Sequence, residues 1–224
     1  MSKLTEIHNA DNLYMASFDI ENLFTNIPLA ETINICIQKL YSNPSLICGF
    51  TQTVFRQLLE LSVHNSFFKF DDKYYRQTEG LGMGLPLGPT LANVFMCHNE
   101  SIWLDNCPLS FKPLHYYRYI DDTCLIFKSK CDVSKFFDYM NSQHPSIKFT
   151  VEHENDNSIS FLDLNLTRKD NMISTSVFRK NTFSGQGISF FSYCCTKFKI
   201  NAINTLLHRA YNICSSNLSL FKEI

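Results

Sequence analysis

The chain has 224 residues, 45% of them hydrophobic, so it can bury a core as one domain with an appended segment. Its 20 basic and 21 acidic side chains nearly balance, which counts against a protein that grips a nucleic-acid duplex by net charge alone. No apolar run approaches the roughly 20 residues that span a bilayer, and no phosphate-loop or dinucleotide fingerprint is present. A membrane protein, an ATPase and a dehydrogenase are therefore disfavoured.

The first predicted strand ends at the first candidate site residue, Asp19. Residues 13–18 read Leu-Tyr-Met-Ala-Ser-Phe, an extended-looking apolar run. Pro28, a good first-turn residue, opens a helix predicted to run to Tyr41. Asp19 thus lies near a strand end that leads into a helix. At such a place an aspartate is either a buried salt-bridge partner or, with other carboxylates, a metal ligand.

A helix over residues 51–64 and a hairpin over residues 66–77 are predicted next. Thr51 is a good N-cap, and an apolar stripe follows it at helical spacing: Val54, Leu58 and Leu61. The hairpin alternates around Asp71-Asp72-Lys73 and carries aromatic residues that we expect to pack in a sheet, although they could also stack on bases: Phe67, Phe68, Tyr74 and Tyr75. Arg76 beside them is a candidate phosphate contact.

A glycine-rich loop follows and leads into a helix. Residues 80–88 hold four glycines, and Pro89 then opens a helical pattern: Leu91, Val94, Phe95 and His98. Glycine permits positive φ and lets another backbone, a sugar or a base approach closely. By itself such a loop is weak evidence of function.

Residues 116–127 read Tyr-Tyr-Arg-Tyr-Ile-Asp-Asp-Thr-Cys-Leu-Ile-Phe and form the most informative segment. Their flanks predict a hairpin with Asp121 and Asp122 at its tip. Two like charges about 4 Å apart repel by roughly 4 kcal/mol at an effective dielectric near 20, so the tip needs water or a positive charge. An Asp-Asp turn explains the pair without a ligand, and a divalent cation explains it by coordination. With Asp19 the pair makes three carboxylates able to hold two cations about 3.5–4 Å apart, as two-metal phosphoryl transfer requires.

The remaining elements complete an α+β pattern. We predict a helix over residues 132–143, a hairpin with strands at 159–167 and 172–178, and a helix over residues 200–211. The order of strand, helix, hairpin, helix and strand fits a ferredoxin-like split βαβ fold.

Two features of composition bear on location and partners. Nine cysteines occur without a C-x-x-C motif, and no signal peptide is recognised, so we expect free thiols and an intracellular protein. Residues 164–224 hold eight basic and two acidic side chains, against 12 and 19 in residues 1–163. The basic tail could contact phosphates, although a solvated surface explains any one of its side chains equally well.

Taken in order, these segments resemble the palm of a reverse transcriptase. Their amino-acid sequence is most similar to that of the Penelope-like retroelements, which are relatives of telomerase. The resemblance covers about residues 14–212 and rests on seven ordered stretches: residues 17–28, 74–77, 82–96, 118–123, 144–152, 161–163 and 205–210. It implies a ferredoxin-like polymerase palm over residues 1–165 with the fingers region largely missing. Residues 166–224 would then be a primer-grip hairpin and a basic, partly helical connector toward a thumb or endonuclease outside this sequence.

The resemblance also implies a set of metal ligands. Asp19 and Asp121 would be the principal ligands of two Mg²⁺ ions, with Mn²⁺ as an alternative. Asp122 would act as a weaker or indirect ligand, and the Ile20 carbonyl as a backbone ligand. The three aspartates would be the catalytic residues of nucleotide transfer to a primer 3′-hydroxyl.

Substrate contacts follow from the same resemblance. Phe24 falls at the aromatic steric gate that selects deoxynucleotides, and Gly88 would line the template and incoming base. Lys148 lies in the stretch where polymerases often place a general acid for the pyrophosphate, although a solvated lysine at a strand edge is the commoner explanation.

The implied activity is that of an RNA-directed DNA polymerase. Its partners would be an RNA template, a DNA primer and deoxynucleoside triphosphates, with no membrane, and its location nuclear; the oligomeric state stays open. The alternative is a truncated, inactive retroelement remnant that retains at most nucleic-acid binding. Intact Asp19, Asp121 and Asp122 favour descent from an active polymerase, because decay would tend to break them.

Overall fold

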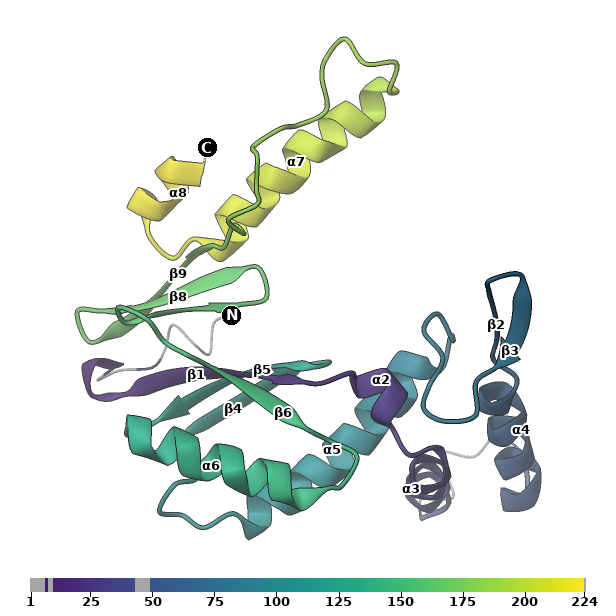
Figure 1. Cartoon of the computed structure of the whole chain (residues 1–224). Coiled ribbons are helices and arrows are strands. Elements are labelled where there is room, and N and C mark those ends of the chain that lie inside the picture. The colour runs from purple at the N-terminus through teal and green to yellow at the C-terminus, as the bar shows by residue number, and fades with distance from the viewer. Residues whose placement is uncertain (1–6, 8–9, 43–48, 224) are drawn as a thin grey trace.

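The centre of the molecule is a four-stranded antiparallel sheet with two helices on one face (Figure 1). The computed structural model describes residues 7, 10–42 and 49–223. The strands stand in the order β4-β5-β1-β6, with bounds Tyr14–Ile20 for β1, His115–Tyr119 for β4, Asp122–Phe127 for β5 and Phe149–His153 for β6. Helices α5 (Gly88–Asn106) and α6 (Lys130–Gln143) connect them. This order and these crossings are those of the predicted ferredoxin-like α+β palm.

The main core lies between this sheet and its two helices. Alternate residues of β1, such as Phe18, point to this side and are buried, as are Leu125 of β5 and Phe149 of β6. Phe95 of α5 and Phe136 of α6 cover them from the helix side. The period-2 alternation of β1 thus sends its apolar set to the helices and leaves Ser17 and Asp19 on the opposite face.

A second, three-stranded sheet covers part of that opposite face. Its strands are β7 (Ser158–Phe161), β8 (Leu164–Lys169) and β9 (Met172–Val177), and its residues Leu166 and Ile173 bury Met15, Cys124 and Ile126. The single hairpin predicted here is wrong in one respect. The chain turns at Leu162, whose φ is +56°, and splits the first predicted strand into β7 and β8.

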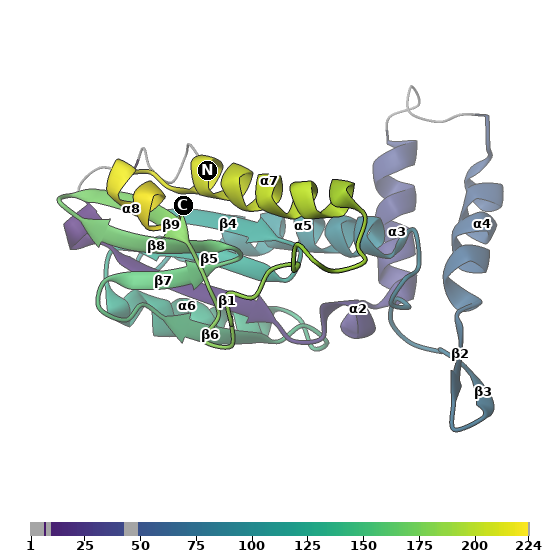
Figure 2. The ribbon, with the colours of Figure 1, turned by 90° about the horizontal axis from the view of Figure 1, so that it is seen from above.

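A helical lobe stands beside the end of α5 (Figures 1 and 2). It contains α2 (Leu23–Asn26), α3 (Leu29–Tyr41) and α4 (Gln52–His64). Thr51 caps α4 as predicted, because its side-chain oxygen accepts a hydrogen bond from the Val54 amide at 3.4 Å. The predicted apolar stripe, however, is exposed, and α4 instead places Leu59 and Val63 in the main core.

The lobe also carries the hairpin of β2 (Phe67–Phe70) and β3 (Lys73–Arg76), which makes a two-stranded sheet of its own. The expectation that its aromatic side chains pack in a sheet core is wrong, because all eight strand residues are exposed. Phe68 and Tyr75 stack on each other instead, with ring centroids 5.5 Å apart. This hairpin therefore presents aromatic surface to solvent.

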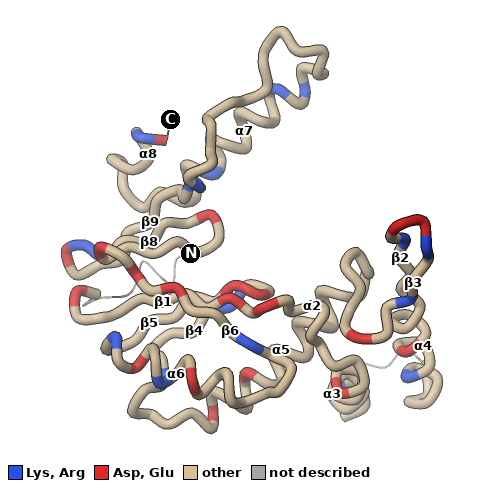
Figure 3. Tube along the Cα trace, viewed as in Figure 1, with Lys and Arg blue, Asp and Glu red and all other residues tan. Residues whose placement is uncertain are grey.

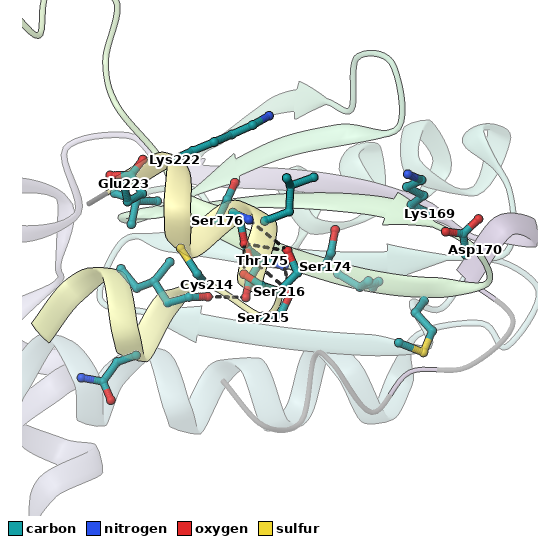
Figure 4. A pocket seen from close by; sticks show the side chains of 17 residues that line it. Lys169, Asp170, Ser174, Thr175, Ser176, Cys214, Ser215, Ser216, Lys222 and Glu223 are labelled. Carbon is teal, nitrogen blue, oxygen red and sulfur yellow. Dashed lines mark hydrogen bonds between the residues drawn. The ribbon is translucent and has the colours of Figure 1, made fainter. Parts of the chain in front are cut away.

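The C-terminal part consists of α7 (Thr196–Ile213), which projects from the sheets, and the short α8 (Asn217–Glu223) (Figure 1). Two hydrogen bonds hold the end of α7 to edge strand β9 (Figure 4). The Thr175 amide donates to the Ser215 hydroxyl at 2.9 Å, and the Ser215 amide donates to the Thr175 carbonyl at 3.0 Å. A cavity of about 900 Å³ lies beside these bonds, and five of its 17 lining residues are serines. A 3-10 turn, η1 (Ala10–Asn12), precedes β1. No helix in the described part of the chain is long and apolar enough to cross a membrane.

Candidate active site

The register of β1 against β5 brings two of the predicted aspartates together. Asp19 and Asp122 are direct antiparallel partners, and both side chains lie on the sheet face opposite the helices. Buried Thr123 fixes this register: its hydroxyl donates to the Phe18 carbonyl at 2.9 Å and accepts from the Phe18 amide at 3.2 Å. A slip of β1 against β5 by one residue would turn the two carboxylates to opposite faces of the sheet, so these bonds hold the acidic pair together.

The turn between β4 and β5 carries the third aspartate. Tyr119 pairs with Asp122, so the two turn residues are Ile120 and Asp121. The prediction placed both aspartates at the tip, whereas the structure places Asp121 in the turn and Asp122 at the start of β5. Ile120 has φ +57°, a left-handed conformation that is strained for a β-branched residue. The Ile20 amide donates to the Asp121 carbonyl at 3.1 Å and ties the turn to the end of β1.

The three carboxylates act on one another electrostatically. Partial burial raises the pKa of Asp19, and the charges of Asp121 and Glu21 raise it further, while a hydrogen bond from the Ile20 backbone opposes the rise. Partial burial likewise raises the pKa of Asp122, with Asp121 and Asp19 adding to the shift. Acidic residues gather where β1 ends and β5 begins (Figure 3). The site is therefore short of positive charge.

A cavity of about 300 Å³ opens over Asp19 and Asp122. Thr150 and Glu152 of β6 line it from the neighbouring strand, and residues 160–162 of the second sheet close another side. Lys180, three residues beyond β9, also lines it. The cavity thus combines carboxylates with one ammonium group, a mixture that suits a ligand carrying both phosphates and a cation.

The donor set fits a hard divalent cation in a limited sense. Among the residues that the structure describes, no group of three or more His, Cys, Asp or Glu side chains is arranged to hold a metal ion by itself. Mg²⁺, however, commonly binds through one or two carboxylates together with water and substrate phosphates. Asp19 and Asp122, partly exposed and mutually repelling, provide that smaller set. Whether Asp121 and the Ile20 carbonyl complete it stays a prediction.

The glycine-rich loop is fastened to the segment that follows Asp19. Gly80 has φ +68°, and a Cβ there would lie 2.3 Å from the Thr25 carbonyl oxygen, so no larger residue fits. The Leu81 amide donates to the Phe24 carbonyl at 2.7 Å. Gly88 is buried, and a Cβ added to it would lie 3.8 Å from the ring of half-buried Phe24. The predicted gate and the predicted base-lining glycine are therefore neighbours.

The two predicted basic contacts lie in different places. Arg76 is exposed on β3 and lines a cavity of about 890 Å³ between the aromatic hairpin and the glycine-rich loop. The Lys148 ammonium donates to the Asn141 carbonyl at 3.0 Å, at the end of α6. Lys180 lines the cavity over Asp19 and Asp122, whereas Lys148 does not. The roles of Arg76 and Lys148 stay predictions.

Comparison with known proteins decides the family. Residues 2–155 match the model of the family described as reverse transcriptase (RNA-dependent DNA polymerase). The chain belongs to the reverse transcriptase family. No protein with a curated description matches the sequence.

Solved telomerase structures share the fold of this reverse transcriptase. Telomerase from Candida albicans in complex with a TWJ fragment of telomeric RNA aligns with TM-score 0.59 and 11% identity, covering 89% of this chain and 34% of that chain. Apo telomerase from Candida tropicalis aligns with TM-score 0.57 and 12% identity, over 72% and 32%. A form truncated from the C-terminal domain gives 0.53 and 13%, over 74% and 35%. The present chain thus spans about a third of the length of these telomerases.

Two residues at this candidate site are not among the predicted site residues; Lys180 is expected only as one of the basic side chains of residues 164–224, and Glu100 is not singled out. Lys180 reaches the cavity only through the packing of the second sheet, and its local sequence gives no signal of this. Glu100 lies on α5 beneath the acidic hairpin and is 7% exposed. A signal for Glu100 was available, because an acidic residue on the buried face of an apolar helix requires a partner.

Proposed function

We propose that this chain is the palm of an RNA-directed DNA polymerase of the Penelope-like type, which adds deoxynucleotides to a primer 3′-hydroxyl by two-metal chemistry. One observation carries the proposal: Asp19 stands directly opposite Asp122 in adjacent strands, and Asp121 occupies the turn beside them. The mutual repulsion of these carboxylates is relieved when a divalent cation binds.

Asp19 and Asp121 would be the principal ligands of the cations, with Asp122 beside them as a weaker or indirect ligand. Mg²⁺ held there, or Mn²⁺ in its place, would supply positive charge that lowers the pKa of the primer hydroxyl and neutralises the departing pyrophosphate. The protein's own contribution is to hold the two carboxylates at fixed partner positions through the Thr123 bonds to Phe18. Phosphoryl transfer needs little covalent help, so positioning and charge provide most of the acceleration.

The surrounding residues suit the substrates of such a polymerase. Phe24 packs beside Gly88 in the short helix α2, five residues beyond Asp19, where its ring would exclude a ribose 2′-hydroxyl. We assign the Lys180 ammonium to a primer or nucleotide phosphate, because it lines the cavity that Asp19 and Asp122 form. Arg76, beside the glycine-rich loop, would contact a phosphate of the template strand or nucleotide.

An RNA template is the partner that the fold favours. The Candida albicans telomerase of the same fold was solved with a fragment of telomeric RNA, and the matched family is that of RNA-dependent DNA polymerases. The exposed aromatic hairpin and the basic residues 164–224 offer further surface for stacking on bases and for phosphate contacts.

Primer extension tests the proposal directly. The purified chain is given oligo(dT) annealed to poly(rA), with dTTP and either Mg²⁺ or Mn²⁺. We expect extension that a chelator stops and that Asp19→Asn abolishes, because this change removes a carboxylate charge that would hold the cation.

Two results would overturn the proposal. The first is extension at an unchanged rate by Asp19→Asn. The second is a wild-type chain that neither extends the primer nor binds Mn²⁺, as followed by electron paramagnetic resonance; that result would favour the inactive remnant.

A further inference from the structure

A buried arginine lies beneath the turn that carries Asp121. The side chain of Arg118, on β4, is 6% exposed, and its Nε donates to the two carboxylate oxygens of Glu100 at 2.7 and 2.8 Å. Its Nη1 donates to the Ile120 carbonyl at 2.9 Å, and its Nη2 to the Asn93 side-chain oxygen at 3.0 Å. One guanidinium therefore joins helix α5 to the strained residue of the turn.

The helix presents a face that is built to hold this guanidinium. Asn93, Cys97 and Glu100 follow one another at spacings of four and three on α5, and the Cys97 sulfur lies 3.3 Å from Arg118 Nη2. The Tyr116 hydroxyl donates to Glu100 at 2.5 Å. Burial raises the pKa of Glu100, while Arg118 and Tyr116 oppose that rise. Each charge of the pair thus has a partner, as buried charges require.

We propose that Arg118 is a positioning residue for the reaction: by holding the Ile120 carbonyl against α5 it fixes the turn, and with it the place of Asp121. This inference rests on the proposed polymerase function. It assigns to Arg118 no contact with substrate or metal, and it couples Asp121 to the helix that begins at Gly88, the predicted base-lining residue.

The conformation of the turn explains why such a clamp is needed. A non-glycine residue held in the left-handed region costs on the order of 1–3 kcal/mol and persists only where its surroundings over-determine it. Ile120 is such a residue, and two backbone groups of the turn are held from outside: its own carbonyl by Arg118, and the Asp121 carbonyl by the Ile20 amide. Without the first bond the turn is free to relax toward a less strained shape.

Arginine is suited to this task in a way that lysine is not. Its planar guanidinium donates at once to the Glu100 carboxylate, the Ile120 carbonyl and the Asn93 side-chain oxygen, which lie in different directions. A lysine ammonium keeps the charge that Glu100 needs but offers its donors from a single point. Arg118→Lys therefore removes the clamp while leaving the buried carboxylate paired.

The molecule contains a matched control. Arg168 of β8 forms a buried ion pair with Glu154, the two side chains being 8% and 5% exposed. Its guanidinium also donates to backbone carbonyls, at Ala10 and Asp11, and to the side chain of Asn157 at 2.7 Å. Arg168→Lys thus removes the same kind of network, but from the second sheet and the segment ahead of β1 rather than from the turn of Asp121.

The experiment compares Arg118→Lys with Arg168→Lys in the full chain by three measurements. Hydrogen exchange of peptides covering residues 116–124 should rise roughly tenfold in Arg118→Lys and stay unchanged in Arg168→Lys. In primer extension, kcat should fall about 10- to 100-fold in Arg118→Lys, with KM for the template–primer within about twofold. The Mn²⁺ concentration for half-maximal binding should rise about fivefold or more in that variant alone. Asn93→Ala, which removes only one bond of the clamp, should shift all three in the same direction by less.

The outcomes separate this inference from the proposed function. If wild-type protein neither binds Mn²⁺ nor extends a primer, the proposed function fails, and hydrogen exchange still shows whether Arg118 holds the turn. If both arginine variants lose thermal stability alike but keep exchange, kcat and Mn²⁺ binding near wild type, Arg118 is a structural pair and the inference is wrong. The inference is equally wrong if Arg168→Lys loses as much kcat as Arg118→Lys.

Discussion

Two hairpins of this chain carry an Asp-Asp pair, and the pairs differ in register and in neighbours. In the β2–β3 hairpin, Asp71 and Asp72 are themselves the two turn residues, with φ of +49° and +57°, as a type I′ turn requires. Asp72 pairs with Lys69 at 2.6 Å, and both side chains are largely exposed. In the β4–β5 hairpin the pair is shifted by one residue, so that Asp122 enters the strand.

This shift, together with the strand beside β5, explains why one Asp-Asp pair forms only a turn and the other belongs to the candidate site. Among the described residues the β2–β3 hairpin pairs with no third strand, whereas β1 runs beside β5 and places Asp19 opposite Asp122. The shift also puts Ile120, a residue unsuited to positive φ, in the turn, so this tip must be held by Arg118 and Ile20. The same dipeptide is thus a local turn signal in one hairpin and part of a charged cluster in the other.

The largest expected difference lies between the same Asp→Asn substitution made in each of the two hairpins. Asp121→Asn should lower the rate of primer extension by about 1,000-fold or more, because it removes a charge that stabilises the bound cation and hence the transition state. Asp71→Asn should leave the rate within about twofold, since asparagine tolerates the left-handed turn. Single-nucleotide addition under saturating substrate measures both. Equal losses in the two variants would show that the hairpins are not functionally distinct.

The next largest effect should come from removal of the Thr123 hydroxyl, which helps to fix the register of β1 against β5. Thr123→Val keeps the shape of the side chain but leaves the Phe18 amide and carbonyl without their hydroxyl partner. Loss of such buried bonds costs about 1–3 kcal/mol, which urea unfolding can resolve. Thr167→Val, at a partly buried position of β8 whose hydroxyl bonds the Ser158 hydroxyl instead of backbone groups of a neighbouring strand, serves as a control and should cost less. A Thr123→Val protein as stable as wild type would mean that the strand pairing alone sets the register.

The aromatic residue beyond Asp19 should affect selectivity rather than rate. Phe24→Val removes the ring that packs beside Gly88 and opens space next to the sugar. We expect discrimination against ribonucleotides to fall by roughly tenfold, with deoxynucleotide addition changed less. Competition between dTTP and UTP on the poly(rA) template measures this ratio. An unchanged ratio would return Phe24 to the role of a core residue.

Sequence reasoning reached the elements whose signals are local. The Thr51 cap, the strand that leads to Asp19 and the β2–β3 hairpin each follow from one short stretch, and they lie where predicted. It missed what depends on packing between distant segments. The split of the strand at Leu162, the exposure of the aromatic hairpin, and Lys180 in the cavity are set by which surfaces meet in the fold.

The smallest effect concerns the dependence of stability on pH. Asp122 has a raised pKa in the folded protein, so the folded state binds its proton more tightly than the unfolded chain does. In the unfolded chain the pKa of an aspartate is about 3.9. Stability is therefore lost as the pH rises from that value through the raised one. In the absence of metal, Asp122→Asn should melt about 1–2 °C above wild type at pH 7 and level with it near pH 3.

Asp72→Asn provides the comparison, because Asp72 faces Lys69 instead of other carboxylates. Its melting temperature should stay within about 1 °C of wild type or fall slightly at pH 7, since exposed ion pairs contribute little. Mg²⁺ should narrow the gap between Asp122→Asn and wild type, because the cation supplies the missing positive charge only where the carboxylates cluster. Destabilisation by Asp122→Asn at pH 7 without metal would show that the three carboxylates do not repel one another as their positions imply.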